Sequence, residues 1–536
     1  MSGPSRLLGE IHPGPISDAS KEALRTLCEA DAALRLVRKD PELYGPDPER
    51  IRTAEHRMDW VDLADTMAER VEDIRDFARD ALKDGLTHAV LLGMGGSSLA
   101  PLVFVETFGV GKGGLSLEVL DSSSPDAVRR VAGSLAPEDT LILVSSKSGT
   151  TAEPQALKSY FEAFLKARLG EDWPRRMVAI TDPGTPLAEE AREEGWRRVF
   201  LNPPDIGGRY SALSYFGLVP LALLGHDIDR LLASAREMLE AVRTGIGEKN
   251  PALALGALLG GAFAAGRDRL TLVGGGPARS FPLWLEQLVA ESTGKDGKGL
   301  LPVAMEPERQ RYGSDRLFVT IGGGGGVPAG EPWAHFALES PFDLGREMLR
   351  FEMGVALSGV VMGLDPFNEP NVAESKANTR RILEGLCPGD ALPGHPVRVE
   401  EAVGLIRDLL RRLDRGAYLQ VAAYVDPGAG HDAQLRLLRK RLSGLTDVPI
   451  TSGYGPRFLH STGQYHKGGR PVGSFIQLVS ESEPLEIPGA PYGFEVLIRA
   501  QAEGDREALA RRGFPVVTVD LGADVERGLS MLTQEL

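Results

Sequence analysis

The sequence predicts an α/β fold built on parallel sheets that helices cover on both faces. Short apolar runs recur along the chain, and each ends in a polar or glycine-rich turn that leads into a helical stretch. Continuous apolar strands that alternate with helices are typical of such sheets. Glycine accounts for 64 of the 536 residues, above the usual share of about 7%, and it clusters where apolar runs end. We therefore expect many tight turns from strand to helix.

The chain begins with a predicted helical lead-in over residues 1–60, and a first α/β domain is expected over 61–235. Apolar residues at helical spacing, with charges between them, predict amphipathic helices at 19–39 and 61–83. From residue 87 the period changes. Five strand-like runs follow, at 88–92, 115–121, 140–146, 176–182 and 197–202.

A second α/β domain is expected over 236–390 and a C-terminal α/β region over 391–536. The second domain contains a mostly helical segment at 337–385 and two strand-like runs that end in glycines, at 268–276 and 315–326. The proline-rich stretch 386–397 is interpreted as a linker. Beyond it, four further strand-like runs alternate with helical ones.

The composition narrows the classes of function. Acidic residues outnumber basic ones by 75 to 60, so the net charge of −15 disfavours nucleic acid and membrane surfaces as partners. Cys28 and Cys387 are too few for a disulfide framework or a zinc site, which fits a reducing cytoplasm. The longest apolar run, 252–266, is too short to span a bilayer and predicts a buried helix. No apolar signal core follows Met1, so we expect a cytoplasmic protein.

Two turns carry the residues of a candidate binding site. Between a strand and a helix lie Gly93, Gly95, Gly96, Ser97 and Ser98, whose backbone N–H groups and hydroxyls can approach an anion or a sugar. A plain tight turn is the alternative. A later strand runs into the hydroxyl-rich segment Ser146, Lys147, Ser148, Gly149, Thr150 and Thr151. Hydroxyls at a helix N-terminus suit a phosphomonoester, whereas a capped helix with solvated hydroxyls is the competing interpretation.

The segments GMGGS (93–97) and SKSGTTAE (146–153) together resemble the sugar-isomerase (SIS) domain of the phosphoglucose isomerase family. The resemblance implies two doubly wound SIS domains within 61–390, with the C-terminal α/β region as an extension. Regulators and isomerases share this domain, so these two segments support phosphosugar binding more firmly than catalysis.

Two further motifs resemble catalytic segments of that family. GGRYS (207–211) matches a family motif whose arginine stabilises negative charge on the reacting oxygens, which would be the role of Arg209. Gln287 and Glu291 lie one helical turn apart in a segment similar to the family's Q-x-x-x-E-[SG]-x-G-K signature. The resemblance makes Glu291 the general base and Gln287 a substrate-binding residue. A structural turn and a solvated glutamate are the plainer interpretations.

A late segment, MGLDPFNEPNVAESKANTRR, resembles the family's lysine segment and would make Lys376 the lysine that reaches the sugar phosphate. The match is incomplete. Glu369 stands where the family has Gln, Asn371 where it has Gly, and Ala373 where it has Glu. A surface lysine on a helix is the alternative.

The family's ring-opening histidine normally lies between the catalytic glutamate and the lysine. Residues 292–375 contain one histidine, His335, which matches no family motif. The segment FLHSTGQYHKGG (458–469) resembles the family's histidine motif, which implies a catalytic role for His460, with Gln464 beside it and His466 a neighbour. This rearranged order resembles the isomerase half of transaldolase/phosphoglucose isomerase fusions. In the usual order a neighbouring subunit donates the histidine, whereas a relocated segment could serve its own chain.

The resemblance implies an enzyme of carbohydrate metabolism that interconverts glucose 6-phosphate and fructose 6-phosphate through a cis-enediolate. No metal or organic cofactor is expected, and the partner is a small sugar phosphate. A homodimer and a separate transaldolase partner are both compatible with the resemblance. Two alternatives stay open: a non-catalytic phosphosugar-binding SIS protein, and a transaldolase label inherited from fusion relatives. The isomerase motifs span 93–469 and leave no room for a transaldolase barrel of about 250 residues.

Overall fold

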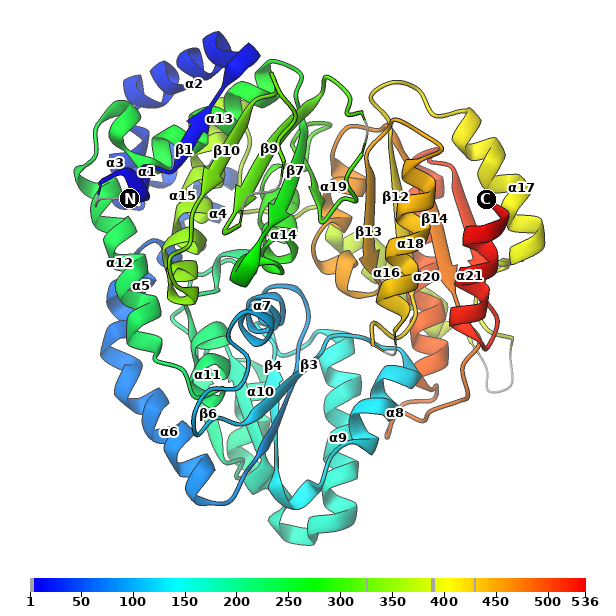
Figure 1. The fold of residues 1–536 in the computed structure, drawn as a ribbon. Coiled ribbons are helices and arrows are strands. Elements are labelled where there is room, and N and C mark those ends of the chain that lie inside the picture. The colour runs from blue at the N-terminus through cyan, green and yellow to red at the C-terminus, as the bar shows by residue number, and fades with distance from the viewer. Residues whose placement is uncertain (1–3, 310, 324–325, 387–390, 429) are drawn as a thin grey trace.

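The computed structural model describes residues 4–309, 311–323, 326–386, 391–428 and 430–536. Three five-stranded sheets organise the chain, and helices pack around each, so the α/β class with parallel sheets is confirmed. Figure 1 shows the second sheet (green) beside the third (orange and red), with the first sheet (cyan) adjoining both. The linker predicted at 386–397 lies partly outside the described residues.

The first sheet has the strand order β3-β2-β4-β5-β6, and all its neighbouring strands are parallel. Its central strand β4 pairs with both β2 and β5, so that Val144, for example, lies opposite Leu92 and Ala179. The strands are β2 (His88–Leu92), β3 (Ser116–Leu120), β4 (Thr140–Ser145), β5 (Met177–Thr181) and β6 (Arg198–Leu201).

The second sheet has the order β1-β10-β9-β7-β8. Its first strand comes from the predicted helical lead-in and pairs antiparallel with β10, so this segment is not purely helical. Its three residues pair with backbone groups of β10 that would otherwise lie at the edge of the sheet. The strands are β1 (Glu10–His12), β7 (Arg269–Gly274), β8 (Leu301–Ala304), β9 (Arg316–Ile321) and β10 (Trp333–Phe336).

The third sheet has the order β11-β15-β14-β12-β13 and is parallel throughout. Within each sheet, the first long strand lies between the second and the third, which creates a switch point in strand order. Ligands of doubly wound sheets bind at the carboxyl ends of the strands beside such a point. The strands are β11 (Val397–Arg398), β12 (Tyr418–Tyr424), β13 (Ile450–Tyr454), β14 (Gly473–Val479) and β15 (Val516–Asp520).

The helices at 17–29 and 32–37 pack against helices of the second sheet, whereas most other helices of the N-terminal half surround the first sheet. Before it come α1 (Pro4–Leu8), α2 (Ser17–Glu29), α3 (Ala32–Val37), α4 (Pro48–Glu55), α5 (Leu63–Thr66) and α6 (Val71–Lys83). Within and after it come α7 (Leu99–Phe108), α8 (Pro125–Gly133), α9 (Ala152–Leu169), α10 (Pro186–Glu193) and α11 (Tyr215–Leu223).

The remaining helices belong to the second and third sheets. The first group comprises α12 (Ile228–Thr244), α13 (Pro251–Ala264), α14 (Phe281–Thr293) and α15 (Leu344–Met362). The next helix, α16 (Val372–Glu384), packs against the helix at 494–511 beside the third sheet. The second group comprises α17 (Val399–Arg411), α18 (His431–Ser443), α19 (Gly463–Gly468), α20 (Phe494–Arg511) and α21 (Val525–Glu535). The apolar run at 252–266 forms the buried helix α13, as predicted. Among the described residues, none of the helices combines the length and apolarity needed to cross a membrane.

One large hydrophobic core joins the N-terminal helices to the first two sheets, whereas the third sheet has a core of its own. The third sheet is nevertheless packed firmly against the others. Phe494 and Leu497 of α20 enter the core on the outer face of the first sheet, and Tyr465 packs with Leu301 and Val303 of β8. These apolar contacts fix the C-terminal region, residues 397–536, relative to the rest of the chain.

Candidate active site

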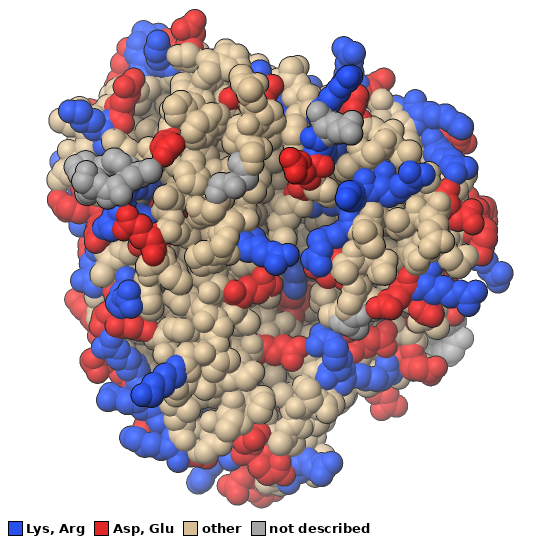
Figure 2. Space-filling model, viewed as in Figure 1, with Lys and Arg blue, Asp and Glu red and all other residues tan. Residues whose placement is uncertain are grey.

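A cavity of about 290 Å³ lies at the carboxyl ends of β2 and β4, where loops and helices associated with all three sheets contribute residues. This is the switch point of the first sheet, where the strand order predicts a ligand site. Eleven of the sequence-predicted site residues line its walls: Gly96, Ser97, Ser146, Lys147, Ser148, Thr151, Arg209, Gln287, Glu291, Lys376 and His460. Gly93, Ser98, Gly149 and Thr150 belong to the same two turns but do not line the cavity. Over the face drawn in Figure 2, basic and acidic residues are interspersed.

Hydroxyl groups dominate one end of the cavity, which we call the hydroxyl end (residues 146–151). The loop leaves β4 and enters α9, whose first N–H groups point back toward it. Ser146 is buried, and its Oγ has no hydrogen-bond partner among the described residues. Gly149 has φ +66°, and an added Cβ would lie 2.8 Å from Leu187 Cβ, so glycine is required at this turn. The loop thus offers hydroxyls and amide donors to an anion.

Two contacts in the loops around the cavity were not expected from the sequence: an ion pair of Lys147 and a close approach at Gly96. Lys147 lines the cavity, but its Nζ donates to Asp182 Oδ2 at 2.6 Å, so its ammonium is already paired. Gly96 allows the first loop to touch the GGRYS segment, because a Cβ there would lie 2.0 Å from Gly208 O. That close approach sets the distance between the first loop and Arg209.

Charged groups dominate the other end, which we call the charged end (Arg209, Glu291, Glu369 and His460); all but Glu369, whose side chain is 38% exposed, are buried. Arg209 is 2% exposed, and all three of its guanidinium nitrogens donate hydrogen bonds. Nη1 lies 3.3 Å from Glu291 Oε2 and 3.0 Å from Glu369 Oε2. Nε donates to Ser292 Oγ at 3.1 Å, and Nη2 donates to the carbonyls of 366 and 368. Five partners therefore hold the Arg209 plane in place.

Glu291 lies in the last turn of α14 and is buried. Burial raises the pKa of its carboxyl to about 7, although the neighbouring Arg209 guanidinium opposes the rise. Gln287 Nε2 lies one turn earlier, 3.4 Å from Glu291 Oε2 and 2.9 Å from the carbonyl oxygen of His460. A carboxyl that titrates near neutral pH is suited to exchange protons with a substrate.

Lys295 holds the segment that carries Glu369. Its Nζ donates to the carbonyls of Asp365 and Asn368, at 2.7 and 2.6 Å, and to Asn368 Oδ1 at 2.9 Å. Burial lowers the pKa of this lysine to about 7. Hydrogen bonds from Lys295 and Arg209 therefore hold residues 365–369 at the cavity wall.

His460 reaches the cavity from the carboxyl end of β13, at the end of a short 3-10 helix, Arg457–His460. Its Nε2 lies 3.0 Å from Glu153 Oε1 in the first turn of α9. Burial acts to raise the pKa of Glu153, but the His460 contact outweighs it and leaves that pKa below its usual value. Arg457 pairs with Asp121 through two hydrogen bonds of 2.6 and 2.5 Å, which ties this segment to the first sheet.

The other histidines considered in the sequence lie outside the cavity lining. His335 sits on β10, where its Nδ1 lies 2.8 Å from Thr320 Oγ1. His466 is buried against Tyr418, and burial lowers its pKa to about 3. Gln464 lies behind the wall, where it bonds Asn371 N and Gly294 O at 2.9 and 2.8 Å. Lys376 is exposed on α16 and borders the cavity.

Sequence reasoning assigned no role to three residues at the site. Arg57 and Glu369 line the cavity, and Glu153 contacts His460 from behind. Glu153 belongs to the quoted SKSGTTAE segment, so a signal for it existed. Glu369 was recognised only as a departure from the family pattern. Arg57 lies in no quoted motif, and only the fold brings it to the wall.

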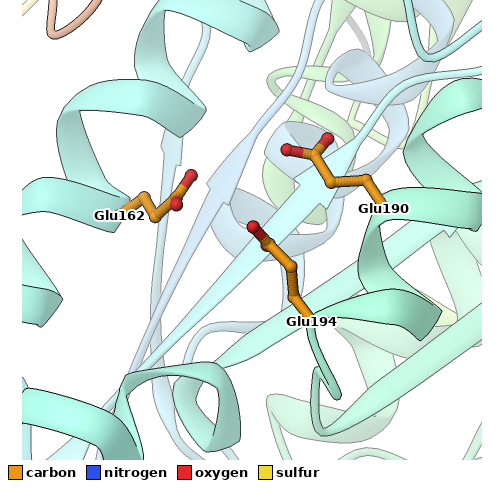
Figure 3. Close-up of side chains that lie close together, drawn as sticks. All are labelled: Glu162, Glu190 and Glu194. Carbon is orange, nitrogen blue, oxygen red and sulfur yellow. The ribbon is translucent and has the colours of Figure 1, made fainter.

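One group of acidic residues among those described has the spacing of a cation site: Glu162, Glu190 and Glu194 (Figure 3). None of the three lines the cavity. Lys166 pairs with Glu162, Lys158 pairs with Glu190, and Trp196 Nε1 donates to Glu194, so each of the three carboxylates already has a partner. The group is therefore interpreted as part of the ion-pair surface of α9 and α10.

Comparison with known proteins supports the assignment suggested by the motifs. Residues 57–300 match the model of the family described as phosphoglucose isomerase. A glucose-6-phosphate isomerase of Thermus thermophilus is 39% identical over 193 residues, which cover 36% of this chain and 45% of the relative. One of Prochlorococcus marinus is 34% identical over 286 residues, which cover 48% and 54%. The chain thus spans about half the length of the curated relatives it matches.

Solved structures agree on the fold. A hypothetical protein of Thermus thermophilus superposes with a TM-score of 0.59 at 26% identity, covering 70% of this chain and all of that one. A glucose-6-phosphate isomerase of Chlamydia trachomatis gives a TM-score of 0.53 at 18% identity, covering 69% and 85%. The segment with His460 lies outside the residues that the family model matches. Residues 57–300, a little under half of this chain, therefore resemble the phosphoglucose isomerase family.

Proposed function

We propose that this chain is an aldose/ketose isomerase that interconverts glucose 6-phosphate and fructose 6-phosphate. One observation carries the proposal: Glu291, Arg209 and His460 line the same cavity as the hydroxyl end. A phosphosugar binder needs the hydroxyl end alone. A buried carboxyl with a pKa of about 7, opposite a fixed guanidinium, adds what proton transfer requires.

The hydroxyl end would hold the phosphate. Ser146, Ser148 and Thr151 would donate from their hydroxyls, together with N–H groups of the first turn of α9. Ser97 and Gly96 would approach the sugar from the first loop. Because these contacts are remote from C1 and C2, their binding energy fixes the sugar against the charged end.

Ring opening comes first in the proposed mechanism. His460, with Lys376 nearby, would move a proton from the anomeric hydroxyl to the ring oxygen. An ionised Glu153 accepts a hydrogen bond, so Nε2 of His460 would carry the proton of that bond. Nδ1 would then be the nitrogen that exchanges a proton with the sugar.

Isomerisation of the open chain follows. Glu291 would remove the proton from C2 of the aldose and return it to C1, and the reverse reaction would begin at C1. Arg209 would stabilise the negative oxygen of the cis-enediolate, because its guanidinium is fixed before the charge develops. Gln287 would hold Glu291 relative to His460.

A single chain supplies every group in this scheme, so we propose that the site is complete without a second subunit. A coupled assay tests the function: purified chain is given fructose 6-phosphate, and glucose 6-phosphate is detected without added metal. We expect turnover. Binding of both sugar phosphates by calorimetry without turnover would favour a non-catalytic phosphosugar-binding protein instead.

A further inference from the structure

A chain of buried hydrogen bonds lies behind His460 and ends on the C-terminal helix α20. Gln501 of α20 donates from Nε2 to Glu153 Oε1 at 2.7 Å, the same oxygen that lies 3.0 Å from His460 Nε2. Ser123, just after β3, donates from Oγ to Gln501 Oε1 at 2.5 Å. All four side chains are buried. The order of contacts is Ser123, Gln501, Glu153, His460.

The direction of each bond in this chain is fixed by chemistry. An ionised Glu153 can only accept, so the Gln501 NH₂ must face it, and the amide oxygen is left to accept from the Ser123 hydroxyl. Glu153 Oε1 then receives two donors, one from Gln501 and one from His460. A buried carboxylate is costly unless its lone pairs are satisfied. Gln501 therefore satisfies a second lone pair of the oxygen that faces His460.

The packing of α20 makes this donor rigid. Phe494 and Leu497, on the N-terminal half of α20, share a core with Leu157 and Phe161 of α9. Because α9 also carries Glu153, the same helix pair that buries these side chains sets the distance between Gln501 and Glu153. Gln501 does not line the cavity, so it acts through Glu153 and not on the sugar.

We propose that Gln501 is a positioning residue for ring opening: it holds the Glu153 carboxylate, which in turn orients the His460 imidazole. The proposal rests on the proposed isomerase function. The C-terminal region would thus supply both the acid/base histidine and part of the support that aligns it, although neither residue lies in the segment that the family model matches.

Gln501→Met tests the proposal, because methionine keeps a similar length and removes both amide hydrogen bonds. We expect kcat with ring-closed fructose 6-phosphate to fall roughly 10- to 100-fold, the usual cost of losing a group that orients a functional side chain, with a smaller change in KM. Turnover of 5-deoxyfructose 6-phosphate, which has no hydroxyl to close the ring, should be almost unchanged. Equal losses on both substrates, or no loss on either, would overturn the proposal.

The matched control is Gln477→Met. Gln477 is also buried in the C-terminal region, but it bonds Ala502 O and Thr518 and does not touch the Glu153 pair. Ser123→Ala is a milder second variant, which should give a smaller loss of the same selectivity. In a His460→Ala background, Gln501→Met should cause no additional loss with the ring-closed sugar. Additive losses would contradict an action through His460.

Gln501→Glu tests the pH dependence of activity, which should not change if Gln501 has a purely structural role. The introduced carboxyl can donate to Glu153 only when it is protonated, so the activity of the variant relative to wild type should rise as pH falls. A ratio independent of pH would count against the proposal. If the wild-type chain isomerises neither sugar, the proposed function fails by itself. The imidazole ¹⁵N spectrum of His460 then decides the role of Gln501, since Gln501→Met should change it and Gln477→Met should not.

Discussion

The two ends of the cavity are built in opposite ways. The hydroxyl end comes from six consecutive residues after one strand, and two of them, Ser148 and Thr150, are exposed to solvent. The charged end collects Arg209, Glu291, Glu369 and His460 from segments 251 positions apart in sequence at the extremes, and its arginine is 2% exposed. The hydroxyl end is thus one contiguous loop that is partly exposed to solvent, whereas the charged end is assembled from distant segments and its Arg209, Glu291 and His460 are buried.

This difference suggests a division of labour. A phosphate carries its own charge and can be bound by hydroxyls and amides in partly wet surroundings, from which it leaves easily. Proton transfer and an enediolate need charges whose effects water does not screen, which requires burial. We therefore expect changes at the charged end to act on turnover and changes at the hydroxyl end to act on KM.

Glu291→Gln should have the largest effect, because it removes the proposed proton carrier and keeps the shape of the side chain. Turnover should fall roughly 10²- to 10⁴-fold, while calorimetry should find sugar-phosphate binding nearly intact. Glu286→Gln is the matched control. Glu286 lies on the same helix, is buried, and also has a pKa raised to about 7 by burial, but it does not line the cavity. Near-normal turnover of Glu291→Gln would remove the basis for the isomerase proposal.

His460→Ala should rank second, with a loss of about 10² in kcat on the ring-closed sugar. The open analogue 5-deoxyfructose 6-phosphate should lose little, since it bypasses ring opening. His335→Ala serves as the control, because His335 occupies the interval where the usual family order places the histidine. Mixing His460→Ala with Glu291→Gln adds a test of the single-chain site. Recovered activity in the mixture would mean that subunits exchange the histidine.

The hydroxyl end could be predicted in detail because contiguous residues carry its whole signal. Strand, loop and helix follow one another in sequence, so Ser146 to Thr151 could be placed without knowing the rest of the fold. Arg209, Glu291 and His460 were predicted only through the family resemblance. Their meeting in one cavity depends on how three sheets pack, and local pattern does not encode that packing.

The features that the sequence did not predict also depend on tertiary packing. β1 is three residues long and joins the second sheet across more than 320 positions, so periodicity within its own segment gives no signal. Arg57 and Gln501 reach the site only through tertiary contacts, and neither lies in a recognisable motif. Lys147 was predicted to bind the phosphate, and the structure places it at the cavity wall, but sequence could not reveal that Asp182 engages its ammonium.

Thr151→Ala should have a smaller effect, and of a different kind. One hydroxyl that bonds a charged phosphate contributes about 1.5 kcal/mol or more, so KM should rise about tenfold with little change in kcat. Thr244→Ala, at an exposed helix end, is the control. Free glucose should be a poor substrate for the same reason. If kcat fell and KM did not change, the division between the two ends would be wrong.

Glu369→Gln should have the smallest effect, and it restores the residue found in the family pattern. Glu369 competes with Glu291 for Arg209 Nη1, and its negative charge adds to the raised pKa of Glu291. The variant removes that charge and leaves the guanidinium to Glu291, so the pKa of Glu291 should fall. Arg209 should stay in place, because Ser292 and the carbonyls of 366 and 368 still hold it.

The sign of the pH effect follows from the role of Glu291 as a base. The base must be ionised, so wild-type kcat/KM should decline as pH falls through about 7. In Glu369→Gln this decline should begin at lower pH, and the plateau above it should change less than tenfold. The control is Glu374→Gln, which removes a carboxylate five residues away that pairs with Arg512 outside the cavity. A decline that stays in place in Glu369→Gln would mean that Glu291 does not feel the second carboxylate. A decline that moves to higher pH would mean that Glu369 stabilises the ionised form of Glu291. In that case Arg209 Nη1 would bond Glu369 alone and would not be shared between the two carboxylates.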